Sequence, residues 1–64
     1  MQIDRVKLIA EMAKQRISVV ELSERSGLSR SSITSVRNGK SCSTATGKAI
    51  AHALNVKIEE LQED

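Results

Sequence analysis

The chain has 64 residues, which makes one domain near the lower size at which a hydrophobic core holds without help. It has one cysteine and no Phe, Tyr or Trp, so no intramolecular disulfide can form and the core must be aliphatic. No apolar run is long enough to span a membrane, and neither a signal peptide nor a usual metal-binding pattern is visible. These absences predict a cytoplasmic protein without a membrane partner.

The net charge of +2 hides an uneven distribution. Residues 1–57 carry all ten Lys and Arg with four acids, which gives +6, and the last seven residues carry four acids, which gives −4. A basic body with an acidic tail suits a nucleic-acid binder, although a small soluble domain can also scatter its charges in this way. Charge alone does not decide between these interpretations.

The first predicted element is a helix over about residues 3–15. Apolar residues recur along it at three- and four-residue spacing, which is typical of an amphipathic helix. The predicted apolar stripe consists of Val6, Ile9, Ala10 and Ala13, with Leu8 and Met12 flanking it.

A second helix is predicted over about residues 19–26. Ser18 can accept a hydrogen bond from the amide three residues on, and Glu21 can reach back to the amide of residue 18. The buried side of this helix is expected to comprise Val19 or Val20 together with Leu22. Gly27 then ends the helix in a left-handed conformation that only glycine enters without penalty.

A third helix is predicted over about residues 29–38, with Ser29 as its N-cap. Ile33 and Val36 fall on one side at three-residue spacing and are expected to face the core. Two short helices joined by a tight glycine turn form a helix-turn-helix, whose second helix is built to lie in the major groove of DNA. The spacing therefore predicts a recognition helix here.

The outer side of this third helix carries the candidate base-contacting residues. Arginine binds guanine O6 and N7 in the commonest specific contact, and short hydroxyls can donate to or accept from base edges. The alternative is that the arginine is solvated or contacts only phosphate. The predicted base contacts are Arg30, Ser31, Thr34 and Ser35.

The end of the third helix is expected to lie beside the sugar-phosphate backbone, where amides, the Asn38 side chain and the Lys40 ammonium position the protein without recognising sequence. Plain helix capping by Asn38 is compatible with that role. Arg37 has an alternative role, because it can pair with Glu11 of the first helix. The predicted phosphate contacts are Ser18, Ser29, Arg37, Asn38, Gly39 and Lys40.

A loop over residues 39–43 leads to a fourth helix over about residues 45–54, capped by Ser43 or Thr44 and stopped by Asn55. A last helical turn is expected over residues 58–62. The buried side of the fourth helix is predicted to comprise Ala49, Ile50, Ala53 and Leu54. The pattern as a whole predicts an all-α fold, a compact bundle of about five short helices in one domain over residues 1–64.

From about residue 17 to residue 61 the chain resembles the lambdoid repressor/Cro type of helix-turn-helix domain, also called the XRE family. The match is carried by Glu21-Leu22-Ser23-Glu24, Gly27-Leu28-Ser29, Ile33, Val36, Arg37-Asn38-Gly39-Lys40 and Ala49-Ile50-Ala51-His52-Ala53-Leu54-Asn55-Val56. The resemblance implies a lambda-repressor-like fold and sequence-specific binding of double-stranded DNA. It also implies a cytoplasmic protein of bacterial or phage type. Three departures are Val19 in place of a phosphate-binding glutamine, Ser23 in place of alanine, and Asn55 in place of glycine.

The resemblance also implies that two subunits meet at the C-terminal end of the domain. A homodimer is therefore expected, with at least part of an apolar set at its interface, and the alternative is that Ile58 and Leu61 only cap their own core. The set is Val56, Ile58 and Leu61.

Two functions follow from these observations. The first is a transcriptional regulator that binds a two-fold DNA site, and the second is an antirepressor or antitoxin that uses the same fold to bind a protein. No catalytic arrangement, cofactor site or small-molecule pocket is expected in so short a chain, so an enzyme is not predicted. Cys42 is expected to be a small, partly buried packing residue, and His52 a surface or interface residue.

Overall fold

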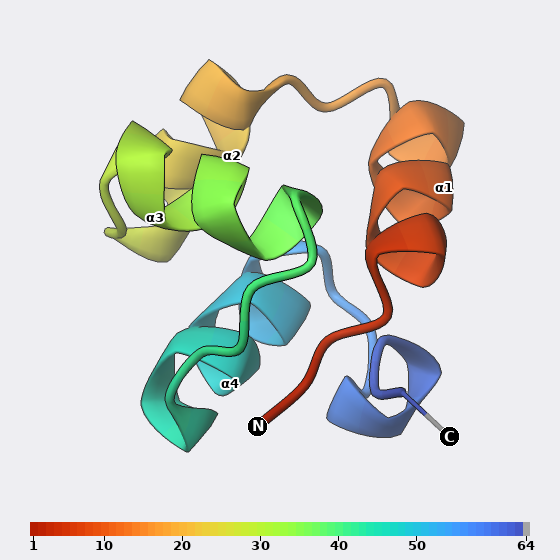
Figure 1. Cartoon of the computed structure of the whole chain (residues 1–64). Coiled ribbons are helices and arrows are strands. Elements are labelled where there is room, and N and C mark those ends of the chain that lie inside the picture. Colours follow the sequence, from red (N-terminus) through yellow and green to blue (C-terminus); the bar gives the residue numbers. More distant parts are fainter. Residues whose placement is uncertain (64) are drawn as a thin grey trace.

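The computed structural model describes residues 1–63 and consists of four α-helices and one turn of 3-10 helix (Figure 1). The elements are α1 (Arg5–Gln15), α2 (Val19–Ser26), α3 (Arg30–Arg37), α4 (Thr44–Ala53) and η1 (Ile58–Glu60). The all-α class is confirmed. The expected fifth helix is a single 3-10 turn, so the predicted helix count is one too high.

Each α-helix begins directly after a polar side chain that accepts a hydrogen bond from a first-turn amide. The four capping residues are Asp4, Ser18, Ser29 and Ser43. The caps at Ser18 and Ser29 were predicted, and Ser43 rather than Thr44 caps α4. Because Asp4 caps α1, that helix starts two residues later than predicted. Each such cap is worth about 1 kcal/mol, which is a sizeable share of the stability of a small domain.

A left-handed residue follows each of the four α-helices, and after α3 that residue is Gly39 (φ 92°). Gly27 (φ 76°) follows α2 and Asn55 (φ 57°) follows the end of α4, both as predicted. Arg16 adopts the same conformation (φ 56°) after α1, which the sequence did not indicate because arginine has no special preference for it. The amide of Arg16 donates to the carbonyl of Ala13, so the last turn of α1 is closed by its own backbone.

The core is entirely aliphatic apart from one methionine. α2 packs against α3 and α4, and α1 packs against α3. The buried apolar residues are Ile3, Leu8, Met12, Ile17, Leu22, Ile33, Val36, Ile50, Ala51, Leu54 and Leu61. On α2 the partner of Leu22 is Val19, which is half-buried, whereas Val20 is 45% exposed. On α4 Ala49 and Ala53 are only half-buried.

The orientation predicted for α1 is wrong. The side that carries Leu8 and Met12 is buried, and the predicted stripe faces outward, with Val6 67% and Ile9 37% exposed. Ile3 and Ile17, which lie just before and just after the helix, are also buried. They add to the apolar surface on the side of Leu8 and Met12, so burying that side removes more apolar area from water than burying the other.

The N-terminal segment joins two distant parts of the fold. Ile3 forms an isolated antiparallel bridge with Gln62, in which the amide of Asp4 donates to the carbonyl of Leu61 (2.8 Å) and the amide of Glu63 to that of Gln2 (3.1 Å). On the other side of the segment, the Gln2 side chain donates to the carbonyl of Gly39 (2.8 Å). The segment therefore holds the loop after α3 in place.

Candidate nucleic-acid interface

The turn between α2 and α3 is fixed by side-chain hydrogen bonds as well as by packing. Ser23 Oγ donates to the carbonyl of Leu28 (2.5 Å), and the Leu28 amide donates to Ser26 Oγ (3.2 Å). Ser23 stands where the resembled family has alanine, and its hydroxyl satisfies a carbonyl of the turn. With Leu22 and Ile33 fully buried beneath the turn, α3 is held at a defined angle to α2.

The outer side of α3 presents a polar row to solvent. Arg30, Ser31 and Thr34 are all exposed. Ser35 is only half-buried and belongs to a different part of the surface, because it lines a pocket between α3 and the start of α4. Ser31 Oγ lies 3.3 Å from Ser29 Oγ, so the hydroxyl at the start of the row is held by the helix cap.

The pocket beside α3 has a volume of about 240 Å³, and five of its seven lining residues carry a hydroxyl group. Its lining residues are Ser32, Ser35, Val36, Ser41, Cys42, Ser43 and Thr46. Cys42 is half-buried and packs against the core, which is the packing role that the sequence predicted for it. Uncharged hydroxyls can donate to an oxygen of the sugar-phosphate backbone without fixing a base preference.

The backbone amides after α3 are already used within the domain. Those of Asn38, Gly39 and Lys40 donate to carbonyls of the last turn of α3 at 3.0–3.1 Å. They cannot also point at a phosphate in this conformation, so the expected contact through the Gly39 amide is not available here. The side chains of Asn38 and Lys40, in contrast, are exposed.

Arg37 does not form the ion pair with Glu11 that was considered above. Among the described residues, the Glu11 carboxylate accepts a hydrogen bond from Gln15 Nε2 (2.8 Å). Arg37 is half-buried, and its Nε is buried without a hydrogen-bond partner in the described part of the chain. Among residues 1–63, no acidic side chain therefore bonds to this Nε.

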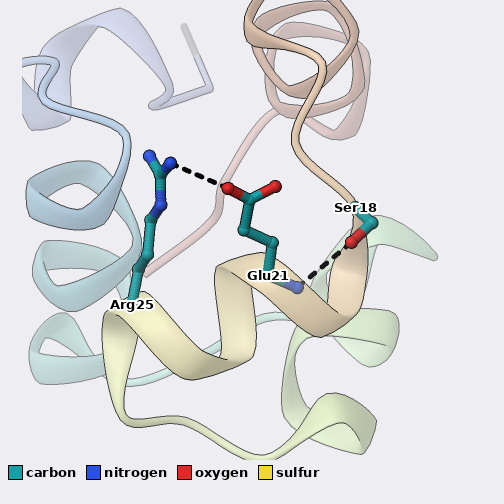
Figure 2. A network of polar contacts seen from close by, with 3 residues as sticks. All are labelled: Ser18, Glu21 and Arg25. Carbon is teal, nitrogen blue, oxygen red and sulfur yellow. Dashed lines mark hydrogen bonds and ion pairs between the residues drawn. The ribbon is translucent and has the colours of Figure 1, made fainter.

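The start of α2 differs from the predicted capping box. Ser18 Oγ accepts from the Glu21 amide (3.1 Å), as expected, but Glu21 does not reach back to residue 18 (Figure 2). Its carboxylate instead accepts from Arg25 Nη2 at 2.8 Å, one turn along the helix. This exposed pair contributes only about 0.3–0.5 kcal/mol, and it compensates the charge of Arg25.

The three residues predicted at the dimer interface differ in their exposure to solvent. Leu61 is 1% exposed and lies in the core of its own domain, which matches the alternative interpretation for this residue. Val56 and Ile58 are half-buried against the core, and the Ile58 side chain approaches α4 at Gly47. Only these two retain apolar surface that a partner can reach without a change in conformation.

Two further properties concern the described residues as a group. No three His, Cys, Asp or Glu side chains among them are placed to hold a metal ion. No helix among residues 1–63 is long and apolar enough to cross a membrane.

Comparison with solved structures identifies the same fold within longer proteins. A variant of hydroxyethylphosphonate dioxygenase matches all of this chain with a TM-score of 0.88 at 25% identity. Native PhpD with cadmium, and PhpD with cadmium and hydroxyethylphosphonate, match with TM-scores of 0.85 and 0.84 at the same identity. The chain spans only 14% of the length of each of these proteins, so the likeness concerns one small unit within them.

No curated protein matches the sequence. A family model described as the Cro/C1-type helix-turn-helix DNA-binding domain matches residues 7–64. That range contains the turn, the polar row of α3 and the whole of α4. The chain therefore belongs to the Cro/C1-type helix-turn-helix DNA-binding domain family.

Proposed function

We propose that the protein is a sequence-specific regulator of transcription, of the Cro or repressor type, that places α3 in the major groove of double-stranded DNA. The observation that carries this proposal is the outer side of α3. Arg30, Ser31 and Thr34 form an exposed polar row on a helix whose inner side is fixed to the core by Ile33 and Val36. Short side chains in such a row allow the helix to approach the floor of the groove.

The contacts divide into base recognition and positioning. Arg30 is assigned to a guanine, and Ser31 and Thr34 to neighbouring base edges, with half-buried Ser35 as the weakest member of the set. Lys40, Asn38 and Arg37 are assigned to phosphates at the end of α3, and the hydroxyls of Ser18 and Ser29 to phosphates near the helix starts. Gly39 serves by its conformation (φ 92°), which turns the chain toward Lys40.

The regulator is proposed to act in the cytoplasm as a homodimer on a two-fold site with half-sites about one helical turn apart. Val56 and Ile58 are the members of the predicted interface that keep accessible apolar surface. The contact is expected to be weak without DNA, because the chain has no aromatic side chain to anchor it.

Selection from a randomised duplex library tests the proposal. The protein should retain a subset of sequences with two related half-sites, and binding should weaken steeply as salt rises because phosphate contacts release counterions. Sedimentation on the selected duplex should give two protein chains per duplex. Salt-dependent binding with no enriched sequence would remove the regulatory function and leave non-specific DNA binding. No retention of DNA at all would favour a protein-binding antirepressor or antitoxin.

One observation favours that second function. Val19 stands where the resembled family carries a phosphate-binding glutamine, and its side chain is half-buried against the core instead of extending toward a ligand. One phosphate contact is therefore missing at the start of α2. The polar row of α3 and the Arg37 Nε, which has no hydrogen-bond partner among the described residues, still favour DNA.

A further inference from the structure

The outer side of α1 carries an apolar stripe whose four residues are all exposed to solvent. Val6 is 67% and Ile9 37% exposed, and Ala10 and Ala13 are exposed as well. The spacing of positions 6, 9, 10 and 13 places them on one side of a helix over two turns. Single exposed apolar residues are ordinary, but a contiguous row on a soluble domain is typical of an interaction surface.

Basic side chains border this stripe on both sides. With about 3.6 residues per turn, Arg5 lies along one edge and Lys7 and Lys14 along the other, and Arg16 follows at the C-terminal end of the helix. Arg5, Lys14 and Arg16 are exposed. The one acid of the helix, Glu11, lies toward the inner side and is hydrogen-bonded to Gln15. The surface therefore has an apolar centre and a positively charged rim.

This charge pattern argues against a second copy of the chain as the occupant. An antiparallel α1 of another copy would place Arg5 near Arg16 at the C-terminal end of the helix. It would also place Lys7 beside Lys14 along one edge of the contact. A parallel arrangement would bring one basic edge against the other. Like charges meet in both cases, which opposes association.

A lipid surface fits the stripe poorly. Helices that lie on membranes insert large side chains such as Trp, Phe and Leu. Two of the four positions in this stripe are alanines, and the helix has no aromatic residue. The small side chains instead allow a second helix to approach closely, at an interaxial distance of about 8 Å.

We propose that the outer side of α1 binds an amphipathic helix of another protein whose apolar stripe is flanked by Asp or Glu. The large apolar anchors come from the partner and pack over Ala10 and Ala13, one turn along α1 from Val6 and Ile9. The acidic flanks of the partner pair with Arg5 on one edge, with Lys14 on the other and with Arg16 at the C-terminal end of the helix. In Figure 1 the body of α1 lies on the other side of the molecule from α2, and the short link of residues 16–18 joins them.

The test uses two labelled synthetic helices of about 18 residues that share one leucine stripe. One carries Glu and the other carries Lys on both flanks. The full chain should bind the Glu-flanked peptide at least about tenfold more tightly than the Lys-flanked one, and Ile9→Lys should weaken that binding about tenfold. Val20→Lys is the matched control, because Val20 is a similarly exposed aliphatic residue on α2. This control should leave peptide binding unchanged.

Charge reversal provides the second arm. Lys14→Glu combined with Arg16→Glu should reverse the preference in favour of the Lys-flanked peptide. Ile9→Lys should keep the selected DNA sequence and its affinity, so a failure of this inference is distinguishable from a failure of the proposed function. Equal binding of the two peptides, or no binding of either, would overturn the inference. So would a concentration-dependent dimer that Ile9→Lys dissociates, or binding of phosphatidylglycerol vesicles without binding of peptide.

Discussion

The outer sides of α3 and α1 belong to helices that pack against each other and share one core, yet they present opposite chemistry to solvent. α3 exposes Arg30, Ser31 and Thr34, a row of hydrogen-bonding side chains in which the Arg30 guanidinium carries the charge. α1 exposes an apolar stripe centred on Val6 and Ile9. Because the inner side of each helix supplies the buried core residues, the residues on the outer side are not needed for packing and can contact a partner. We propose that the first surface binds base edges and the second binds an apolar helix.

The largest expected effect is a loss of folding stability from a substitution in the core that supports both surfaces. Ile33→Ala removes a fully buried side chain beneath α3, and α1 packs on α3. Leaving a cavity there should cost about 2–5 kcal/mol, which is a large part of the stability of so small a domain. Urea unfolding followed by circular dichroism measures the loss. Val20→Ala, at an exposed site, should change stability by less than about 0.5 kcal/mol. Equal effects of the two substitutions would show that α3 does not rest on this core.

Arg30→Ala tests the α3 surface alone. It should cost about 1–3 kcal/mol on the preferred duplex and relax the preference at one base pair, because a bidentate contact to guanine is lost. Affinity should be measured on the selected site and on its single-base variants. An equal loss on every sequence would reassign Arg30 to a phosphate.

Ser29 separates helix capping from DNA contact. Ser29→Ala should lower stability by about 1 kcal/mol, because the Ser32 amide loses its acceptor. Ser29→Asp should restore stability, since aspartate caps as well as serine, but its charge should weaken DNA binding. Thermal unfolding and duplex titration of the same two variants give both results. Normal DNA binding by the aspartate variant would place Ser29 away from phosphate.

Lys40→Ala should weaken binding to all sequences alike and lower the slope of log affinity against log salt by about one unit. Lys40 is exposed in the loop after α3, which suits a contact that positions the protein without recognising bases. Titrations at several salt concentrations on two unrelated duplexes provide the measurement. A changed base preference would contradict the assignment.

The smallest effect is expected at the start of α2. Glu21→Gln breaks the exposed pair with Arg25 and should cost only about 0.3–0.5 kcal/mol. It also frees the Arg25 guanidinium, so DNA affinity at low salt should rise slightly while stability falls. Unfolding and DNA-binding measurements on the same variant at low salt can show whether stability falls while DNA affinity rises. A fall in both quantities would indicate that Glu21 orients the helix start rather than only compensating a charge.

The helix-turn-helix was predictable because its signals are local. Ser18 and Gly27 fix the start and end of α2, and Ser29 fixes the start of α3, through bonds within a few residues of sequence. The orientation of α1 was not predictable in this way. Both of its sides carry apolar residues, and the choice between them depends on Ile3 and Ile17, which join the core from outside the helix.

The same limit applies to the candidate site. The exposure of Arg30, Ser31 and Thr34 followed from the spacing of Ile33 and Val36. The hydroxyl-lined pocket beside Ser35 forms only when the loop after α3 folds against α4. The burial of Leu61 likewise depends on a backbone bond to the N-terminal segment, at the opposite end of the sequence. Which base each side chain contacts remains a prediction.

The bridge between Ile3 and Gln62 places the two ends of the described chain side by side. A unit with adjacent ends can be inserted into a surface loop of another protein through two short linkers, because the host loop need not be stretched to accommodate it. The three solved structures noted above contain a unit of this shape in a much longer chain. The geometry of this domain therefore suits its insertion into a surface loop of a host protein in an engineered fusion. In such a fusion, α3 and the outer side of α1 would both stay exposed to solvent.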